Sequence, residues 1–268
     1  MAGAAFYFLA VSIKLIATLA GVVAVFWIVS KLWPGLHQRS PDEKPIREMI
    51  LSVFNLPVWA AASVILAYTN QTWRVPLVID LHDAKNFSLL VPEFLRIEFP
   101  ATMTVTSAIS WVYYPAWFAF VVLLTDAAFY WVHRLMHVDF FYKALHRVHH
   151  RFLEPTAWCA YSFHFLESVL IVLAAGVLPH LFLPMDLLAA VVFNSIAVFW
   201  SAFLHSRLST ESWQAHPLLR YVNSPSLHRL HHQTGSANFS LYFTIWDKAF
   251  GTDRNKVKLH SALAAETD

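Results

Sequence analysis

The sequence predicts an all-α integral membrane protein of about four to five transmembrane helices with a cytosolic helical cap. The composition is the first observation, because 57% of the 268 residues are hydrophobic and only 13% are charged. Soluble domains carry roughly a quarter charged residues. The second observation is that the apolar residues form long blocks with almost no charge, each about long enough to cross roughly 30 Å of hydrocarbon at 1.5 Å per residue. The length favours a single membrane domain, 1–268.

Five segments fit such spans, and they cover residues 5–30, 48–68, 108–132, 167–183 and 186–204. The first block has no basic residue before it and is too long for a signal peptide, so we interpret it as a retained helix. Pro179 and Pro184 bracket a tight turn between the last two spans. The mixed segment 69–107 is predicted to be a lumenal or periplasmic loop.

The orientation follows from lysine and arginine near the ends of the spans. These residues are frequent in 31–47, in 133–166 and after 204, whereas 1–13 contains none and 69–107 contains three. The best arrangement places the N-terminus outside and the C-terminus in the cytosol. A bacterial protein of this kind would lie in the inner membrane, and a eukaryotic one in the endoplasmic reticulum.

Several classes of protein are excluded by what the chain lacks. A net charge of +2 without a Lys/Arg-rich run gives no basis for nucleic-acid binding. The single cysteine, Cys159, cannot form an internal disulfide, and without a CxxC pair there is no thiolate zinc site. No HExxH protease motif is present either.

Histidines are the third observation, because ten of them fall on the predicted cytosolic side. "HRLMH" places two histidines four residues apart, and the words "LHRVHH" and "LHRLHH" place three at positions i, i+3 and i+4, which is one face of a helix. Neutral imidazole is a common ligand of zinc and iron, and ten rings exceed the needs of one ion. The sequence therefore predicts a site for two metal ions, with the ligand candidates His133, His137, His146, His149, His150, His164, His205, His228, His231 and His232.

Other interpretations stay open for the histidines. Five isolated ones are expected to be structural, namely His37, His82, His180, His216 and His260. A pH-sensing cluster would not require this regular spacing. A metal transporter or metal sensor is a separate hypothesis, although transport sites usually lie near the middle of the membrane.

Beyond these patterns, the segments "TDAAFYWVHRLMH", "YKALHRVHH", "FHFLE", "FLHS", "SPSLHRLHH" and "NFSLYFTIWDKAFGT" occur in this order. Together they resemble the fatty acid hydroxylase / sterol desaturase superfamily of membrane di-metal oxygenases, most closely the sterol C5-desaturase-like branch. The resemblance covers about 125–253, which it implies is the catalytic region, preceded by the spans and connecting loop of 1–124 and followed by a polar tail, 254–268. It implies hydroxylation or desaturation of a lipid with two iron ions and O2, and zinc can replace iron in purified protein.

The resemblance transfers to individual positions. It assigns metal ligands to the HxxxH pair, to both HxxHH words and to His205. His164 falls where the family often has a histidine followed by proline, but Phe165 follows it here. Ser201 stands where some fatty acid hydroxylases have a further histidine.

Carboxylates near the histidines are candidates for the catalytic apparatus. Asp126 precedes His133 by seven residues on the same helical face, and Glu167 follows His164 by three. Each could accept a ring N–H and fix the tautomer of the histidine. Asp247 could do the same, or could pair with Lys248.

The electrons for such a reaction would come from outside the chain, because neither an "HPGG" cytochrome b5 segment nor a GxGxxG nucleotide fingerprint is present. We expect a separate cytochrome b5 or ferredoxin-type donor to dock on a basic face that includes Arg147, Arg229 and Lys248. The lipid substrate would enter laterally from the bilayer, and sterol, sphingoid, fatty acyl and polyprenoid substrates all fit. A non-oxidative lipid-modifying member of the same superfamily is the remaining alternative.

Overall fold

The structure is a computed structural model that describes residues 2–32, 45–72, 105–177 and 187–254. Within these ranges the protein is helical and has no strand, apart from one isolated antiparallel bridge between Val222 and Phe243. The predicted turn at Pro179 and Pro184, the segment 73–104 and four of the isolated histidines (His37, His82, His180 and His260) lie outside the described residues.

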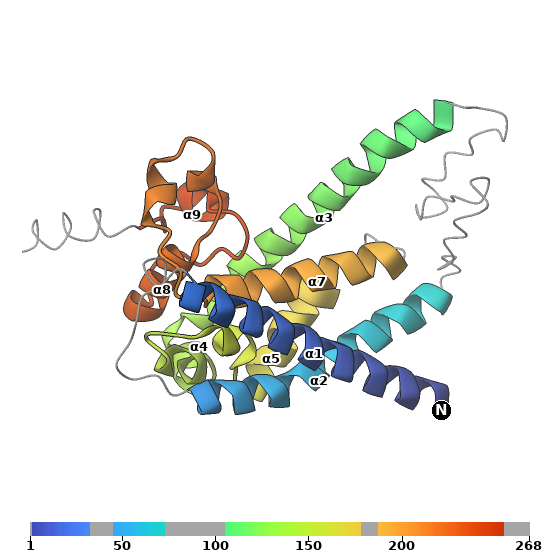
Figure 1. Cartoon of the computed structure of the whole chain (residues 1–268), viewed down its shortest axis with the longest axis horizontal. Helices are drawn as coiled ribbons and strands as arrows, with labels where there is room; N and C mark the ends of the chain where they lie inside the picture. The colour runs from blue at the N-terminus through green and yellow to red at the C-terminus, as the bar shows by residue number, and fades with distance from the viewer. Residues whose placement is uncertain (1, 33–44, 73–104, 178–186, 255–268) are drawn as a thin grey trace, which may run out of the picture.

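The long helices occur where the apolar blocks predict them. They are α1 (Ala2–Leu32), α2 (Pro45–Thr72), α3 (Val105–Met136), α5 (Phe165–Ile171) with its π-helical continuation η6 (Val172–Val177), and α7 (Leu187–Leu204). Figure 1 shows α1, α2, α5 and α7 packed into one bundle, while α3 leaves the bundle at an angle.

Two stretches of helix are long and apolar enough to cross a membrane, Val11–Leu32 in α1 and Pro115–Met136 in α3. The predicted fourth and fifth spans correspond to shorter apolar helices, Phe165–Val177 and Val192–Leu204. The second predicted span lies on α2, which carries Glu48 and Asn55 as buried polar residues. Length and composition of the described helices therefore support two spans.

The main core lies between α1, α2, α7 and the short helix η5 (Ala157–Tyr161), and contains Leu19, Leu56 and Ala202, all fully buried. Polar contacts fasten α2 to the segment that contains η5. Ser162 Oγ donates to Glu48 O at 2.8 Å, and Asn55 Nδ2 donates to Phe163 O at 2.8 Å.

The remaining elements form a cap at one end of the bundle (Figure 1). They are α4 (Asp139–Ala144), η4 (His146–Arg151), η7 (Glu211–Ala215), η8 (Leu219–Tyr221), α8 (Pro225–Thr234) and α9 (Ile245–Ala249). The C-terminal ends of α3 and α7 point to this cap, which is why the histidines that follow those helices can meet there.

Candidate metal centre

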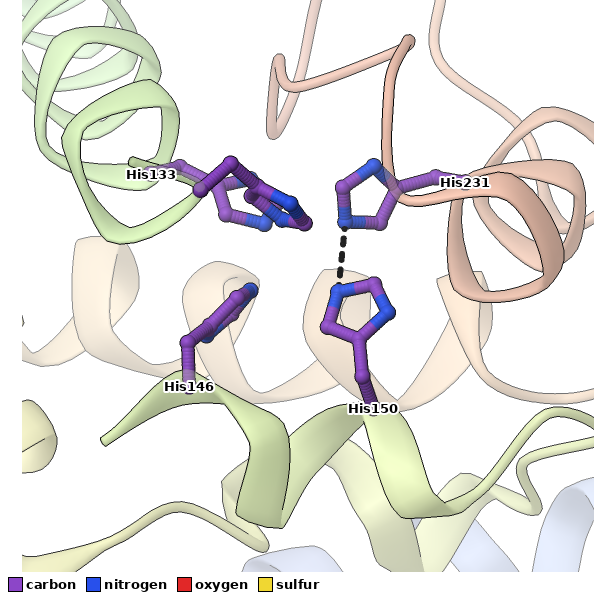
Figure 2. A group of neighbouring side chains, drawn as sticks. His133, His146, His150 and His231 are labelled. Atoms are coloured by element: carbon purple, nitrogen blue, oxygen red, sulfur yellow. Dashed lines mark hydrogen bonds between the residues drawn. The ribbon is translucent and has the colours of Figure 1, made fainter. Parts of the chain in front are cut away.

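The histidines of the cap form two groups. His133, His137, His146, His150 and His231 make the first group, with one ring nitrogen of each within 4.8 Å of the others. His149, His205, His228 and His232 make the second group by the same criterion. Figure 2 shows four members of the first group pointing toward one another from three different segments of the chain. We refer to these as the first and second histidine groups.

The two HxxHH words contribute to both groups in a crossed pattern. In the first word, His146 and His150 belong to the first group, whereas His149 belongs to the second. The second word reverses this, because His228 and His232 belong to the second group and its remaining histidine belongs to the first. Adjacent histidines diverge by about 100° around a helix, so each HH pair can reach two neighbouring positions.

The second word lies on α8, whose ends are set by its sequence. Ser224 is the N-cap and its Oγ accepts from Leu227 N, while Pro225 occupies the first turn, where its missing N–H is not needed. Gly235 ends the helix with φ of 66°, and its N donates to His231 O at 2.7 Å. The helix is therefore just long enough to present all three histidines.

Ring nitrogens within each group approach closely. His150 Nε2 lies 3.1 Å from His231 Nε2 in the first group, as Figure 2 shows. In the second group, His228 Nε2 lies 3.0 Å from His205 Nε2, and His232 Nε2 lies 3.3 Å from both. Several nitrogen lone pairs thus converge on one point in each group.

Five of these rings have Nδ1 against an oxygen. The acceptor is a backbone carbonyl for four of them: His133 Nδ1 lies 2.7 Å from Phe239 O, His231 Nδ1 2.6 Å from Ala237 O, His205 Nδ1 2.7 Å from Ser201 O, and His150 Nδ1 3.3 Å from His232 O. An Nδ1–H that donates to oxygen leaves the lone pair on Nε2, which is the tautomer that a metal ligand needs.

Asn238 shapes a short loop whose backbone carbonyls accept hydrogen bonds from two of these rings. Its φ of 58° is in the left-handed region, which asparagine tolerates better than most residues. The carbonyls on either side of it, of Ala237 and Phe239, accept from His231 and His133. Asp247 supports the same loop by accepting from Phe239 N at 2.8 Å and Ser240 N at 3.1 Å. It contacts neither a histidine nor Lys248, which pairs with Asp253.

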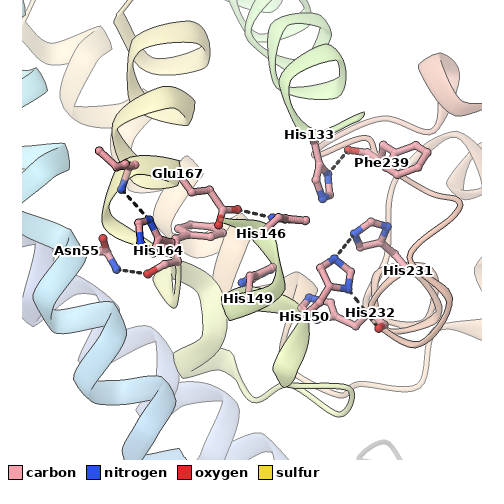
Figure 3. A network of polar contacts seen from close by, with 12 residues as sticks. Asn55, His133, His146, His149, His150, His164, Glu167, His231, His232 and Phe239 are labelled. Carbon is pink, nitrogen blue, oxygen red and sulfur yellow. Dashed lines mark hydrogen bonds and ion pairs between the residues drawn. The ribbon is translucent and has the colours of Figure 1, made fainter. Parts of the chain in front are cut away.

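The fifth oxygen belongs to Glu167, which is fully buried and whose Oε1 contacts His146 Nδ1 (Figure 3). The sequence predicted that His164 is a metal ligand and the partner of Glu167. This prediction is wrong, because the ring of His164 does not join either histidine group. His164 is the N-cap of α5, and its Nδ1 accepts from Leu166 N at 3.2 Å. The N-cap position turns the ring toward the start of its own helix and away from the other histidines.

The predicted role of Asp126 is also corrected, because its carboxylate contacts no histidine. Both oxygens accept from the segment after α8: Oδ1 from Leu241 N and Tyr242 N, and Oδ2 from Phe243 N and the Trp246 indole. Asp126 is fully buried. It therefore holds the C-terminal segment against α3 and acts on the site only through that segment.

Burial keeps the histidines of the two groups uncharged. Desolvation lowers the pKa of His150 to about 4 and that of His137 to about 2, where repulsion from His133 and His150 adds to it. It also lowers the pKa of His231 and His232 well below the ordinary value. At neutral pH these imidazoles are neutral, which is the form that binds a metal ion.

The residues fit two metal ions. Nε2 of His137 and Nε2 of His146 are buried and have no hydrogen-bond partner, although a buried polar atom normally has one. A cation between the converging nitrogens would satisfy them together with the other rings of the first group. The donor set consists of imidazole alone, which suits iron and zinc.

A largely apolar cavity adjoins the histidines. It is bounded by His133, His146, His149, His205 and His228 at one end, and its walls come from α2, α3, η5, η6 and α7. Most of the lining is hydrophobic, including Trp59, Phe129, Phe163, Ile171 and Phe193. An apolar ligand in this cavity would lie directly beside both histidine groups.

The comparison with known families agrees with this site. The model of the fatty acid hydroxylase family matches residues 118–252, about half of the chain and including nearly the whole cap. The chain belongs to the fatty acid hydroxylase family. No solved structure matches the chain.

Curated relatives of this fatty acid hydroxylase family member carry sterol names. A "Delta(7)-sterol 5(6)-desaturase" of Gibberella zeae is 32% identical over 137 residues, which is 51% of this chain and 37% of the relative. A "Putative methylsterol monooxygenase" of Dictyostelium discoideum is 35% identical over 130 residues, 48% of this chain and 47% of the relative. A "Probable Delta(7)-sterol 5(6)-desaturase" of Neurospora crassa is 25% identical over 223 residues, 77% of this chain and 63% of the relative. The matches cover less than two thirds of each of these relatives.

Glu167 gives a test of the hydrogen bonds behind the rings. We expect Glu167→Ala to weaken metal binding by about 10- to 100-fold, the usual effect of losing a group that orients a ligating histidine. Glu167→Gln should lose less, because its amide oxygen can still accept from His146 Nδ1. Metal titration of the metal-free protein with zinc would measure both.

Glu154→Gln is the matched control, since Glu154 lies outside both groups and accepts from Gln233 at 2.5 Å. Its zinc affinity should equal that of the wild type. An unchanged affinity in Glu167→Ala would show that Glu167 does not orient His146.

Proposed function

We propose that this family member is a non-haem di-iron oxidoreductase of the membrane that hydroxylates or desaturates a C–H position of a sterol-class lipid. The single observation that carries the proposal is the position of both histidine groups at one end of an apolar cavity. The sterol names of the relatives support the substrate class.

The first group would hold one ion and the second group the other. When bound there, iron would supply the activation of O2 that an unactivated C–H bond requires. The chain's own contribution is orientation and exclusion of water. Backbone carbonyls and Glu167 fix the rings through Nδ1, and the cavity walls, such as Phe129 and Phe193, would keep the substrate in an apolar environment.

The membrane arrangement is part of the proposal. We propose four to five spans, with α2, α5–η6 and α7 crossing or entering the bilayer beside α1 and α3, and with the cap in the cytosol. The division into spans (1–124), catalytic region (125–253) and polar tail (254–268) goes with it. The exposed apolar side chains of α1, including Ile13, Trp27 and Leu32, are compatible with lipid contact.

The electron donor is proposed to be a separate cytochrome b5 or ferredoxin-type protein. Arg147 and Arg151 are exposed on the cap beside the first word and could contact an acidic donor. Arg229, which the sequence suggested for this role, is buried and donates to Glu211 at 3.2 Å. It therefore stabilises the cap and is not part of a docking surface.

Metal analysis tests the proposal. Detergent-purified full-length protein from cells grown with added iron should contain about two metal ions per chain, because the two groups hold five and four histidines. The ions should survive dialysis against a mild chelator, since a cage of imidazoles releases them slowly. Elemental mass spectrometry measures the content, and lipid profiling of cells that express the protein then identifies the oxidised lipid.

Zero ions, or one loosely held ion, would contradict the dinuclear proposal and would favour the transport hypothesis, in which ions must leave readily.

A further inference from the structure

Two tyrosines are among the polar residues in the wall of the cavity. Tyr161 comes from η5 and Tyr242 from the segment held by Asp126, and both line the cavity. They are buried, with 4% and 5% of their surface exposed. Neither phenol oxygen makes a hydrogen bond within the described part of the chain.

These two phenols lack the hydrogen-bond partner that a buried tyrosine normally has. A tyrosine O–H inside a protein usually finds a partner, because an unpaired hydroxyl in an apolar environment is unfavourable. Burial raises the pKa of both residues, and proximity of Tyr161 adds to the increase at Tyr242. Both phenols are therefore protonated and can each donate one hydrogen bond to a molecule in the cavity.

Both tyrosines belong to segments that pack beside the last turn of α7, which precedes His205. Next to Tyr161, Ala160 O accepts from Ser201 Oγ at 3.2 Å, and Ser201 O in turn holds His205 Nδ1 at 2.7 Å. Next to the same turn of α7, the rings of Tyr242 and Trp200 are 6.1 Å apart. An oxygen bound by the phenols would therefore lie in the same cavity that histidines of both groups line.

We propose that Tyr161 and Tyr242 bind an oxygen function of the substrate, a hydroxyl or carbonyl, inside the cavity. This inference rests on the proposed function and narrows it to a substrate class. A 3-hydroxysterol carries such an oxygen on an otherwise apolar skeleton.

The test compares two probes on the full-length protein, 5α-cholest-7-en-3β-ol and its 3-deoxy counterpart 5α-cholest-7-ene. The protein is loaded with zinc, which has no redox chemistry, so that binding is measured without turnover. Dissociation constants come from spin-column binding of tritium-labelled probes in detergent. We expect the wild type to bind the 3-hydroxysterol about tenfold more tightly, the factor that one neutral hydrogen bond contributes.

Phenylalanine variants then test whether the two tyrosines cause the preference for the 3-hydroxysterol. Tyr161→Phe and Tyr242→Phe should each reduce it, and the double variant should bind both probes equally. Tyr221→Phe is the matched control, because Tyr221 is 39% exposed on the cap and does not line the cavity. It should keep the full preference.

A preference that persists in the double variant would overturn the inference, and so would a wild type that binds both probes equally or neither. The zinc content of each sample distinguishes these outcomes from failure of the proposed function. Two ions per chain with no hydroxyl preference would refute only the role of the tyrosines, whereas absence of bound metal would refute the dinuclear centre itself.

Discussion

His231→Ala is expected to lower the metal content from about two ions per chain to about one and to reduce lipid oxidation by more than about 100-fold, beyond the effect of losing an orienting group. His231 is fully buried, and its Nε2 lies 3.1 Å from His150 Nε2. Removal of the ring leaves the first group with four histidines and a void in the middle of the site. His149→Ala should have the matching effect on the second group, which would retain three histidines. Elemental analysis and product formation by mass spectrometry measure the two consequences in the same preparation.

His216→Ala and His260→Ala are the controls, and both should keep two ions and full activity. His216 is exposed and its Nδ1 accepts from Leu218 N and Leu219 N, away from both groups. Normal metal loading in His231→Ala or His149→Ala would disprove the assignment of these histidines as ligands.

Asp126→Ala is expected to destabilise the protein without removing any proposed ligand. Its carboxylate accepts four hydrogen bonds, from Leu241 N, Tyr242 N, Phe243 N and the Trp246 indole, at 2.7 to 3.0 Å. Their loss leaves buried donors unsatisfied, and breaking such a network costs about 3–5 kcal/mol. The melting temperature of the detergent-solubilised protein should fall by roughly 10 °C.

Asp139→Ala is the matched control, because Asp139 has a 91% exposed side chain and pairs only with Lys143 on the next turn. It should melt within about 1 °C of the wild type. A melting temperature for Asp126→Ala as high as that of this control would show that the carboxylate does not hold the C-terminal segment.

Local pattern predicts the helices well because the information is local. Long apolar blocks with few charges mark α1 and α3, and the spacing of the histidine words marks the places where rings would gather. The predicted fourth and fifth spans extend into residues 178–186, which lie outside the described ranges, and the described apolar helices there, Phe165–Val177 and Val192–Leu204, are shorter than a span. A count of apolar residues cannot tell a short buried helix from a crossing one.

Sequence spacing was less informative about the partners of the site. The helical face of Asp126 predicted that its carboxylate accepts from a histidine. Its oxygens instead accept from a segment that begins 115 residues later in the chain. Four of the groups behind the rings are backbone carbonyls, which every residue has and no motif marks. Asn238 is the one signal that could have been used, since asparagine is favoured at the positive φ that aims two of those carbonyls. Tyr161 and Tyr242 carried no pattern, because only the tertiary structure brings them to one cavity.

The crossed use of the two words has a consequence for how the protein is held together. The end of α3, η4, the residue after α7, and α8 are distant in the chain, and the only cysteine cannot join any of them by a disulfide. Two bound ions would hold these four segments together, because η4 and α8 would each contribute ligands to both ions. A ligand that binds only the folded state adds its binding free energy to the stability of that state. Iron supply would then determine how long the cap stays folded as well as its chemistry, so that protein without metal would be less stable as well as inactive.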